Sequence, residues 1–218
     1  MPRPRNARAP FALARALDAH CERLGACRRC ANAPDVMPIV SLARAPRAML
    51  VGQAPGNTEI GGGRPFAGRA GKTLFKWLER AGLDEPTARE WLYISAITRC
   101  YPGPHPGGRG DRVPSPAERA RCGDWLADEL NIIRPGVIIP VGCLAIDRFL
   151  GPLPLNEVVG REHDVEHEGG RSVVIPLPHP SGASSWIHVP EHRALLDRSL
   201  DLLGNRLGLL NMKTRSVA

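Results

Sequence analysis

The sequence lacks a long apolar segment and contains few aromatic residues. No run of about 18 consecutive apolar residues occurs, so a membrane-spanning helix is not expected. The first ten residues, MPRPRNARAP, hold no apolar core segment, so we expect no secretory signal and place the protein in the cytoplasm. Because aromatic residues make up only 5% of the chain, one that lies in a polar loop is a candidate for function. The 218 residues, 43% of them hydrophobic, predict one globular domain.

Acidic residues are absent from both ends of the chain. Residues 1–10 carry three arginines, and residues 211–218 carry one lysine and one arginine, so five of the seven net positive charges lie in these ends. We expect residues 1–10 and 211–218 to be flexible tails around a single domain of residues 11–210. This charge pattern favours nonspecific attraction to phosphate groups, although many unrelated proteins share it.

Cysteines are few and are not spaced like a disulfide framework. Disulfide bonds are not expected among the six cysteines of a chain without a secretory signal. Cys27 and Cys30 form a CxxC pair, which two thiolates of one metal site or a redox pair both explain. Cys100 and Cys122 are two further candidate ligands, separated by 21 residues, whereas zinc ribbons usually show two CxxC pairs. The two remaining cysteines are expected to be small buried residues.

Short apolar runs alternate with segments of helical periodicity. Strands are predicted at residues 47–51, 90–98, 136–142 and 172–177, and helices at 11–26, 71–81, 116–133, 143–150 and 190–203. Residues 37–43 read as a possible short edge strand, and residues 151–170 as an irregular segment. This alternation predicts an α/β fold with a parallel sheet covered by helices on both faces.

Ligands of such folds bind outside the carboxyl ends of the strands. The segments that follow three predicted strands should therefore converge there: the chain from Gly52 onward, Thr98–Cys100 and Pro178–Gly182. The loop after the second strand, residues 101–116, contains five prolines and four glycines, and its Arg109 and Arg112 are candidates for phosphate contacts. The sequence thus predicts one site at the carboxyl edge of the sheet.

The most unusual stretch is the loop GQAPGNTEIGGGRPFAGRAG, residues 52–71. It is rich in glycine, which allows backbone N–H groups to approach a polar ligand, and it contains a single aromatic residue, Phe66. Its end, GRAGKT, is similar to a P-loop, but position 66 lacks the glycine that the full pattern requires. The GKT also lies about twenty residues after the strand, whereas a P-loop follows its strand directly. ATP or GTP binding is therefore disfavoured.

The same stretch resembles the first motif of the family-4 uracil-DNA glycosylases, in which GE(A/G)PG is followed after a spacer by GRPFVGRAG. Two other signals agree with it in order along the chain: the cysteines are similar to that family's four cluster cysteines, and PHPS at 178–181 is similar to the superfamily's last motif. The resemblance implies a three-layer α/β/α fold around a four-stranded parallel sheet. It also implies hydrolysis of the bond that joins uracil to the sugar of DNA, and a 4Fe–4S cluster with four ligands, Cys27, Cys30, Cys100 and Cys122.

The chemistry of such a reaction suggests roles for individual residues. A base taken out of the DNA stack needs a flat partner, for which Phe66 is the candidate. The uracil anion needs hydrogen-bond donors, for which we select His179 and backbone N–H groups around Gln53 and Ala54, beside Gly52. The core of the fold is the structural alternative for Phe66.

Other residues are candidates for the sugar cation, the attacking water and the DNA backbone. Glu59, which matches a family acid, is selected for the water and the sugar, with Asn57 in support. The hydroxyl and N–H donors of Ser181, Gly182 and Ser184 suit phosphate contacts. Arg69 and Lys72 add positive charge, or are ordinary solvated helix residues.

Three positions depart from the family pattern and leave the base range open. Gln53 stands where the family has Glu, Ile60 where it has Asp, and Ala96 where it has the Asn that reads uracil. Family-5 glycosylases also carry a small residue at the position of Ala96 and accept several deaminated bases. Either specificity is relaxed or another amide, for which we choose Gln53, reads the base. The expected protein is a monomer that binds uracil-containing DNA and no membrane; the alternative is a noncatalytic damaged-DNA-binding protein with a four-cysteine metal site.

Overall fold

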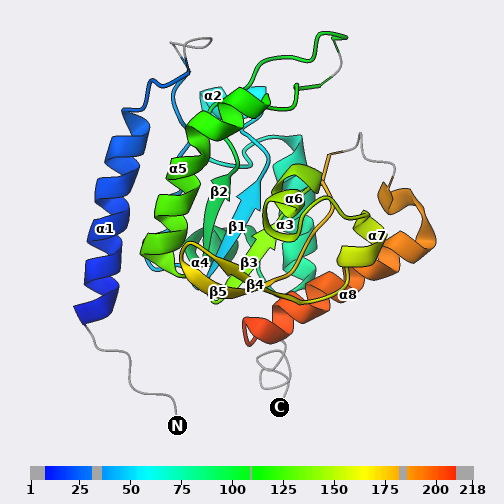
Figure 1. Ribbon diagram of the computed structural model, residues 1–218. Helices are drawn as coiled ribbons and strands as arrows, with labels where there is room; N and C mark the ends of the chain where they lie inside the picture. Colours follow the sequence, from blue (N-terminus) through cyan, green and yellow to red (C-terminus); the bar gives the residue numbers. More distant parts are fainter. Residues whose placement is uncertain (1–7, 31–35, 109, 182–185, 210–218) are drawn as a thin grey trace.

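The computed structural model describes residues 8–30, 36–108, 110–181 and 186–209. Figure 1 shows a central sheet between two layers of helices. The strands are β1 (Ala48–Gly52), β2 (Leu92–Ala96), β3 (Val137–Pro140), β4 (His163–His167) and β5 (Gly170–Val174). The helices are α1 (Arg8–Gly25), α2 (Asn57–Gly62), α3 (Arg69–Arg80), α4 (Glu85–Trp91), α5 (Pro116–Ile133), α6 (Cys143–Leu150), α7 (Leu155–Val158), α8 (Pro190–Arg206) and the 3₁₀ helix η1 (Trp186–His188).

The sheet has the strand order β2-β1-β3-β5-β4. Four strands are parallel, with Gly52 opposite Ala96 and Ile138 opposite Val174 in the register, as the sequence predicted. The fifth strand, β4, is antiparallel to β5 and forms one edge. The predicted four parallel strands are therefore present, but the fifth strand was not predicted, and the prediction of an irregular segment at 151–170 was wrong because α7 and β4 lie in it. The segment was missed because β4 is polar and only half-buried, so it lacks the apolar run of the inner strands.

The inner strands are buried on both faces, which explains their continuous apolar sequences. Alternate residues such as Leu50 and Ile139 contact α3, α4 and α8 on one face. Their neighbours, such as Met49 and Ile138, contact α1, α5 and α6 on the other. The three-layer α/β/α arrangement that the sequence predicted is confirmed, and each face of the sheet is covered by three helices in the described part of the chain.

Element boundaries differ from the predictions at a few places. Residues 90 and 91 end α4 instead of starting a strand, and the described residues 37–43 include no strand. α1 begins at Arg8, inside the range that was expected to be a tail; residues 1–7 and 210–218 lie outside the description. The helix over 116–133 has the predicted bounds because Ser115 caps it and Pro116 occupies its first turn. None of the helices within the described ranges is long and apolar enough to cross a membrane.

Candidate active site

A large pocket opens at the carboxyl ends of the parallel strands. It has a volume of about 1010 Å³, which is room for a nucleotide and not only a base. We call it the strand-end pocket. It is lined by the loop after β1, the start of α3, the end of β2, the loop 101–115 and the chain after β5. The predicted convergence of three strand ends is confirmed for the described residues, since Gln53, Ala96, Arg99 and His179 all contribute to this one pocket.

Phe66 has its ring against the end of β1. A Cβ atom added to Gly52 would lie 3.1 Å from Cζ of Phe66, so a side chain at this position would press on the ring. The ring is half-buried: one side packs on the core between the sheet and α3, and the residue also lines the pocket. Its backbone has a φ of 52°, a left-handed conformation that is uncommon for a residue other than glycine. The ring therefore contributes to the core and to the pocket together.

Glu59 is buried, with 7% of its surface exposed, and its carboxylate binds backbone amides. Its Oε2 accepts a hydrogen bond from the Gly56 N–H at 2.9 Å, and its Oε1 accepts one from the Gly68 N–H at 3.2 Å. The residue thereby joins the beginning of α2 to the beginning of α3 and shapes the loop between them. Asn57, by contrast, is exposed at the start of α2, where it lines the pocket.

His179 follows β5 and is held by Ser181. The backbone N–H of Ser181 donates to Nδ1 of His179 at 3.2 Å, and its hydroxyl lies 2.8 Å from the same atom. Because a backbone N–H only donates, Nδ1 accepts, and the proton of the neutral ring is on Nε2. The ring packs on Gly142, where a Cβ would lie 3.0 Å from Cδ2 of His179. Burial lowers the pKa of His179, which favours this neutral donor form at neutral pH.

The end of β2 presents an apolar side chain to the pocket. Ala96 lines it directly and has no polar atom in its side chain. The neighbouring Ser95 donates its hydroxyl to Oε2 of Glu129 at 2.8 Å and is buried. Gln53 also lines the pocket, and its carbonyl accepts the Thr98 N–H at 3.2 Å, which connects the two strand ends.

A buried polar network around Glu129 of α5 contacts this end of the sheet. The carboxylate of Glu129 accepts hydrogen bonds from Tyr93 at 2.9 Å and from Ser95, pairs with Arg99 and lies 3.2 Å from His20. Burial is the largest influence on Glu129 and opposes its ionisation, but the charge of Arg99 and the hydrogen bonds from His20 and Ser95 together lower its pKa. The sequence analysis did not find Glu129, because a single Glu within a helix gives no signal of its buried partners.

The loop 101–115 was expected to meet DNA, and it forms one wall of the pocket. It folds back on itself through a bridge between Pro104 and Asp111. Asp111 lies against the loop after β1, with Oδ2 2.9 Å from the place where a Cβ of Gly56 would be. Asp111 was missed by the sequence analysis, which considered only the basic residues of this loop. Arg112 is paired through both nitrogens with Glu118 on α5, at 2.7 and 2.5 Å, and Arg109 lies outside the described residues.

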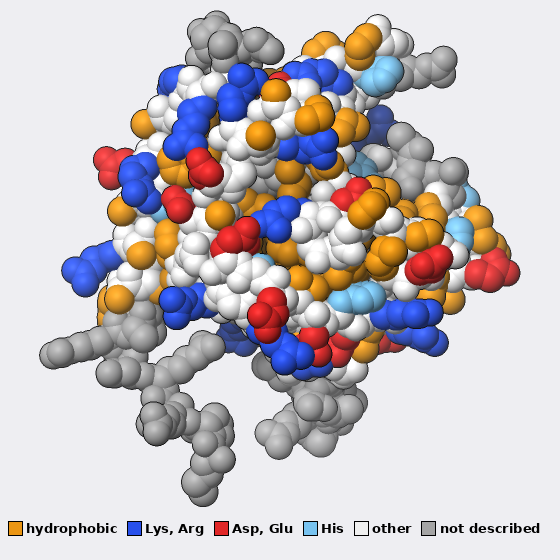
Figure 2. Space-filling model, in the orientation of Figure 1, with side chains coloured by type: hydrophobic (Ala, Val, Ile, Leu, Met, Phe, Trp, Pro, Cys, Tyr) orange, Lys and Arg blue, Asp and Glu red, His pale blue; other side chains and the backbone are white. Residues whose placement is uncertain are grey.

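Positive charge borders the pocket on α3. Arg69 and Lys72 are exposed in the first turn of this helix and line the pocket. Figure 2 shows that basic side chains outnumber acidic ones over the upper part of the molecule, the side of the strand carboxyl ends. Gly182 and Ser184 lie outside the described residues, and Ser181 is bound to His179.

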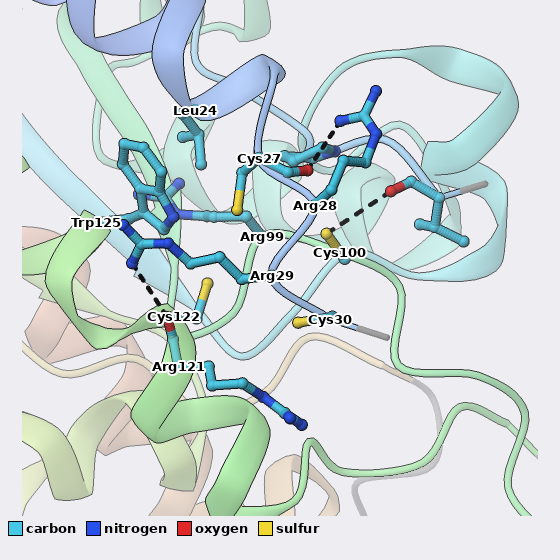
Figure 3. Close-up of a pocket in the computed structure, with 12 residues that line it drawn as sticks. Leu24, Cys27, Arg28, Arg29, Cys30, Arg99, Cys100, Arg121, Cys122 and Trp125 are labelled. Carbon is cyan, nitrogen blue, oxygen red and sulfur yellow. Dashed lines mark hydrogen bonds between the residues drawn. The ribbon is translucent and has the colours of Figure 1, made fainter. Parts of the chain in front are cut away.

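The four candidate ligand cysteines line one cavity between α1, α5 and the chain after β2. Figure 3 shows the sulfur atoms of these cysteines around a common space that Arg28, Arg29, Arg99 and Arg121 also border. The side chains come from three segments of the chain: Cys27 and Cys30 after α1, Cys100 after β2, and Cys122 on α5. Within the described residues, no three His, Cys, Asp or Glu side chains form a group that would hold a single metal ion.

Burial alters the acid–base properties of the thiols in this cysteine cavity. Burial and the three other thiols raise the pKa of Cys100 to about 12, and burial also raises the pKa of Cys122. A bound metal group would lower both pKa values again, because its ligands are thiolates.

The two cysteines outside the cavity were expected to be buried. Cys21 is buried, as predicted, but Cys143 is exposed, so the prediction for Cys143 was wrong. Cys143 is the first residue of α6, and helix starts are accessible.

Comparison with known proteins gives one consistent family. The sequence model described as "Uracil DNA glycosylase superfamily" matches residues 41–200. A type-4 uracil-DNA glycosylase of Archaeoglobus fulgidus is 30% identical over 200 residues, which are 88% of this chain and 94% of that protein. A type-4 enzyme of Thermotoga maritima is 36% identical over 135 residues, 62% of this chain and 65% of that protein. A type-5 uracil-DNA glycosylase of Pyrobaculum aerophilum is 31% identical over 149 residues, 62% of this chain and 61% of that protein.

Proposed function

Because this chain belongs to the uracil-DNA glycosylase superfamily, we propose that it is a hydrolase that removes uracil from DNA and leaves an abasic site. The observation that carries the proposal is the convergence of the glycine-rich loop, Phe66 and His179 on one pocket of nucleotide size. A base must leave the DNA stack before its bond to the sugar is reached, and this pocket has a stacking surface and a donor for it.

Cleavage of the bond leaves negative charge on the uracil ring. In the proposed mechanism Nε2–H of His179 donates to uracil O2, where this charge develops, and the neutral ring is kept in place by Ser181. Phe66 stacks on the base, and Gly52, Gln53 and Ala54 form the wall beside it. Such a donor is effective because it is oriented before the reaction begins.

The sugar cation and the attacking water require a carboxylate or a polar group. Glu59 and Asn57 stay our candidates, although both oxygens of Glu59 accept backbone N–H groups and leave it few remaining lone pairs. Asp111 is a second carboxylate of the same pocket and is exposed. Rates for Glu59→Gln, Asn57→Ala and Asp111→Asn, measured side by side, assign the role to the variant with the largest loss at unchanged DNA affinity.

The base range extends beyond uracil in this proposal. Ala96 offers no hydrogen bond to a base edge, and the pocket volume admits larger bases such as hypoxanthine. Gln53 is the amide that remains at the pocket wall for recognition. Arg69 and Lys72 attract the DNA backbone, with Ser181, Gly182 and Ser184 as further proposed phosphate contacts.

A 4Fe–4S cluster is the proposed occupant of the cysteine cavity. Its support is the joint lining of one cavity by four cysteines and the membership of the chain in this superfamily. The four thiolates would hold the iron, and the cluster would tie the segment after α1 to α5 and to the chain after β2. No step of base excision involves it.

The test is excision from synthetic DNA. Single- and double-stranded oligonucleotides that carry uracil, hypoxanthine or no lesion are incubated with the full chain and then cleaved with alkali. Cleavage at uracil, with no cleavage of undamaged DNA, is the expected result. Binding of uracil DNA without cleavage would contradict the proposal and indicate a damage-binding protein. His179→Ala is the internal check, because loss of its donor should reduce excision by about a hundredfold.

A further inference from the structure

Phe66 is held from behind by an arginine on α4. Nη1 of Arg89 donates to the Pro65 carbonyl at 3.0 Å, and Nη2 donates to the Phe66 carbonyl at 3.3 Å. Arg89 itself is not part of the strand-end pocket, and its side chain is 19% exposed. The guanidinium therefore binds the two peptides that set the direction of the ring, without contact to the space in which a base would lie.

Arg89 is itself fixed on its other sides. Its Nε donates to Oε1 of Glu85, one turn earlier on α4, at 2.8 Å. The guanidinium carbon lies 4.4 Å from the ring centroid of Phe75, a core residue of α3. A planar guanidinium with three hydrogen-bonding partners and an aromatic face below it has little rotational freedom.

The backbone of Phe66 needs such a restraint. Its positive φ is unfavourable for a residue with a side chain, so this conformation persists only where the surroundings impose it. Gly71 also packs on this peptide: a Cβ at this position would lie only 1.9 Å from the Phe66 carbonyl oxygen. The carbonyl is thus in contact with both Gly71 on α3 and Arg89 on α4.

We propose that Arg89 is a positioning residue that holds the strained Phe66 peptide, so that the Phe66 ring stays preorganised to stack on the extruded base. The inference rests on the proposed function of the pocket. Preorganisation matters here because a ring that must be ordered at each binding event loses part of the stacking free energy to entropy. Arg89 acts entirely through Phe66, which distinguishes it from a residue that only stabilises the fold.

The decisive experiment is a double-mutant cycle with excision of uracil as the readout. Arg89→Gln and Phe66→Leu are each expected to lower kcat/KM by about tenfold, which lies within the range for loss of one stacked base. The double variant should also lose about tenfold and not a hundredfold, because Arg89 has no further effect once the ring is gone. Arg89→Lys, which keeps one donor group, should restore part of the rate.

The matched control is Arg80→Gln. Arg80 is an arginine on α3 that pairs with Asp197 and does not line the pocket. It should leave kcat/KM within about twofold of the wild type. Multiplicative losses in the double variant, or equal effects of Arg89→Gln and Arg80→Gln, would overturn the inference.

Hydrogen exchange separates this inference from the proposed function. The amides of residues 64–70 should exchange faster in Arg89→Gln and in Gly71→Ala than in the wild type or in Arg80→Gln. The expected difference in exchange does not depend on whether the wild type excises uracil. An inactive wild type would therefore refute the proposed glycosylase function but not the positioning role of Arg89. Unchanged exchange in both variants would refute the positioning role.

Discussion

At the scale of single residues, backbone amides determine the state of the important side chains. The Ser181 N–H keeps a neutral His179 with its proton on Nε2, and the N–H groups of Gly56 and Gly68 fix the orientation of the Glu59 side chain. Each bond is local in the structure, but the amide that reaches Glu59 from Gly68 depends on how the loop folds back. The role of such a side chain therefore depends on its hydrogen-bond partner as well as on its residue type.

The pH dependence of excision should follow His179. Its pKa is lowered from 6.5 by burial, so the ring stays neutral to a lower pH than an exposed histidine. We expect the single-turnover rate constant to be level around neutral and slightly alkaline pH, and to fall in acidic solution with a midpoint below 6.5. Rates measured under single-turnover conditions exclude product release. An acid limb with its midpoint above 6.5, or the same limb in His179→Gln, would contradict this assignment.

At the scale of elements, the loop 101–115 is attached to the start of α5. Glu118 completes a capping box with Ser115, whose hydroxyl accepts the Glu118 N–H at 3.3 Å while the Ser115 N–H donates to Glu118 at 2.7 Å. The same carboxylate binds both terminal nitrogens of Arg112. Glu118 therefore connects the loop 101–115 to the first turn of α5. This connection fixes the position of the pocket wall relative to the sheet.

Glu118→Gln should lower the free energy of unfolding by about 1 kcal/mol at pH 7. The bond from Arg112 is the main cause that lowers the pKa of Glu118 to about 2. Because this pKa is lowered in the folded state, the stabilisation is present above the unfolded value near 4.5 and declines as the pH falls toward 2. Urea unfolding of both proteins from pH 7 to pH 3 measures it.

The control is Glu79→Gln, an exposed residue of α3. Its effect on the free energy of unfolding should stay within about 0.5 kcal/mol at every pH. A difference between Glu118→Gln and the wild type that does not shrink in acid would show that the ion pair is not its source.

At the scale of the whole molecule, two sites are attached to the same strand end. Arg99 follows β2, borders the cysteine cavity and the strand-end pocket, and is anchored by Glu129 between α1, α5 and the sheet. Loss of order around the cysteines is therefore expected to reach the pocket through a buried path. α1 and the CxxC segment after it pair with no strand of the sheet. Through this path they are expected to support the strand-end pocket.

The cysteine cavity should determine the thermal stability of the protein. Protein purified without oxygen should be brown, with broad visible absorbance and about four irons per chain. Cys27→Ser and Cys122→Ser should lose iron and lower Tm by several degrees, because metal binding adds to the free energy of folding. Cys143→Ser, at an exposed position outside the cavity, should retain the iron and the Tm of the wild type. Zinc in place of iron, or equal behaviour of all three variants, would refute the cluster.

The layers of the fold and most of the site are predictable because their signals are local. Continuous apolar runs indicate strands buried on both faces, and the parallel sheet then brings its carboxyl ends together. Phe66 and His179 stand out as an aromatic and a histidine in loops at these ends. β4 escaped prediction because an edge strand that is polar and half-exposed has no such run.

The sequence by itself determined the family, the α/β/α layers, and the candidate residues at the strand ends, because spacing and residue type are local properties of the chain. Only the tertiary structure decided what those residues touch. It placed Glu59 on two backbone amides, brought Asp111 to the pocket, paired Arg112 with Glu118 and seated Arg89 behind Phe66. The contacts of Arg89 with Phe66 and of Asp111 with the loop after β1 join segments far apart in the chain. Those of Glu59 and Arg112 lie within short stretches, but their partners too depend on how each loop packs, which residue type alone does not specify.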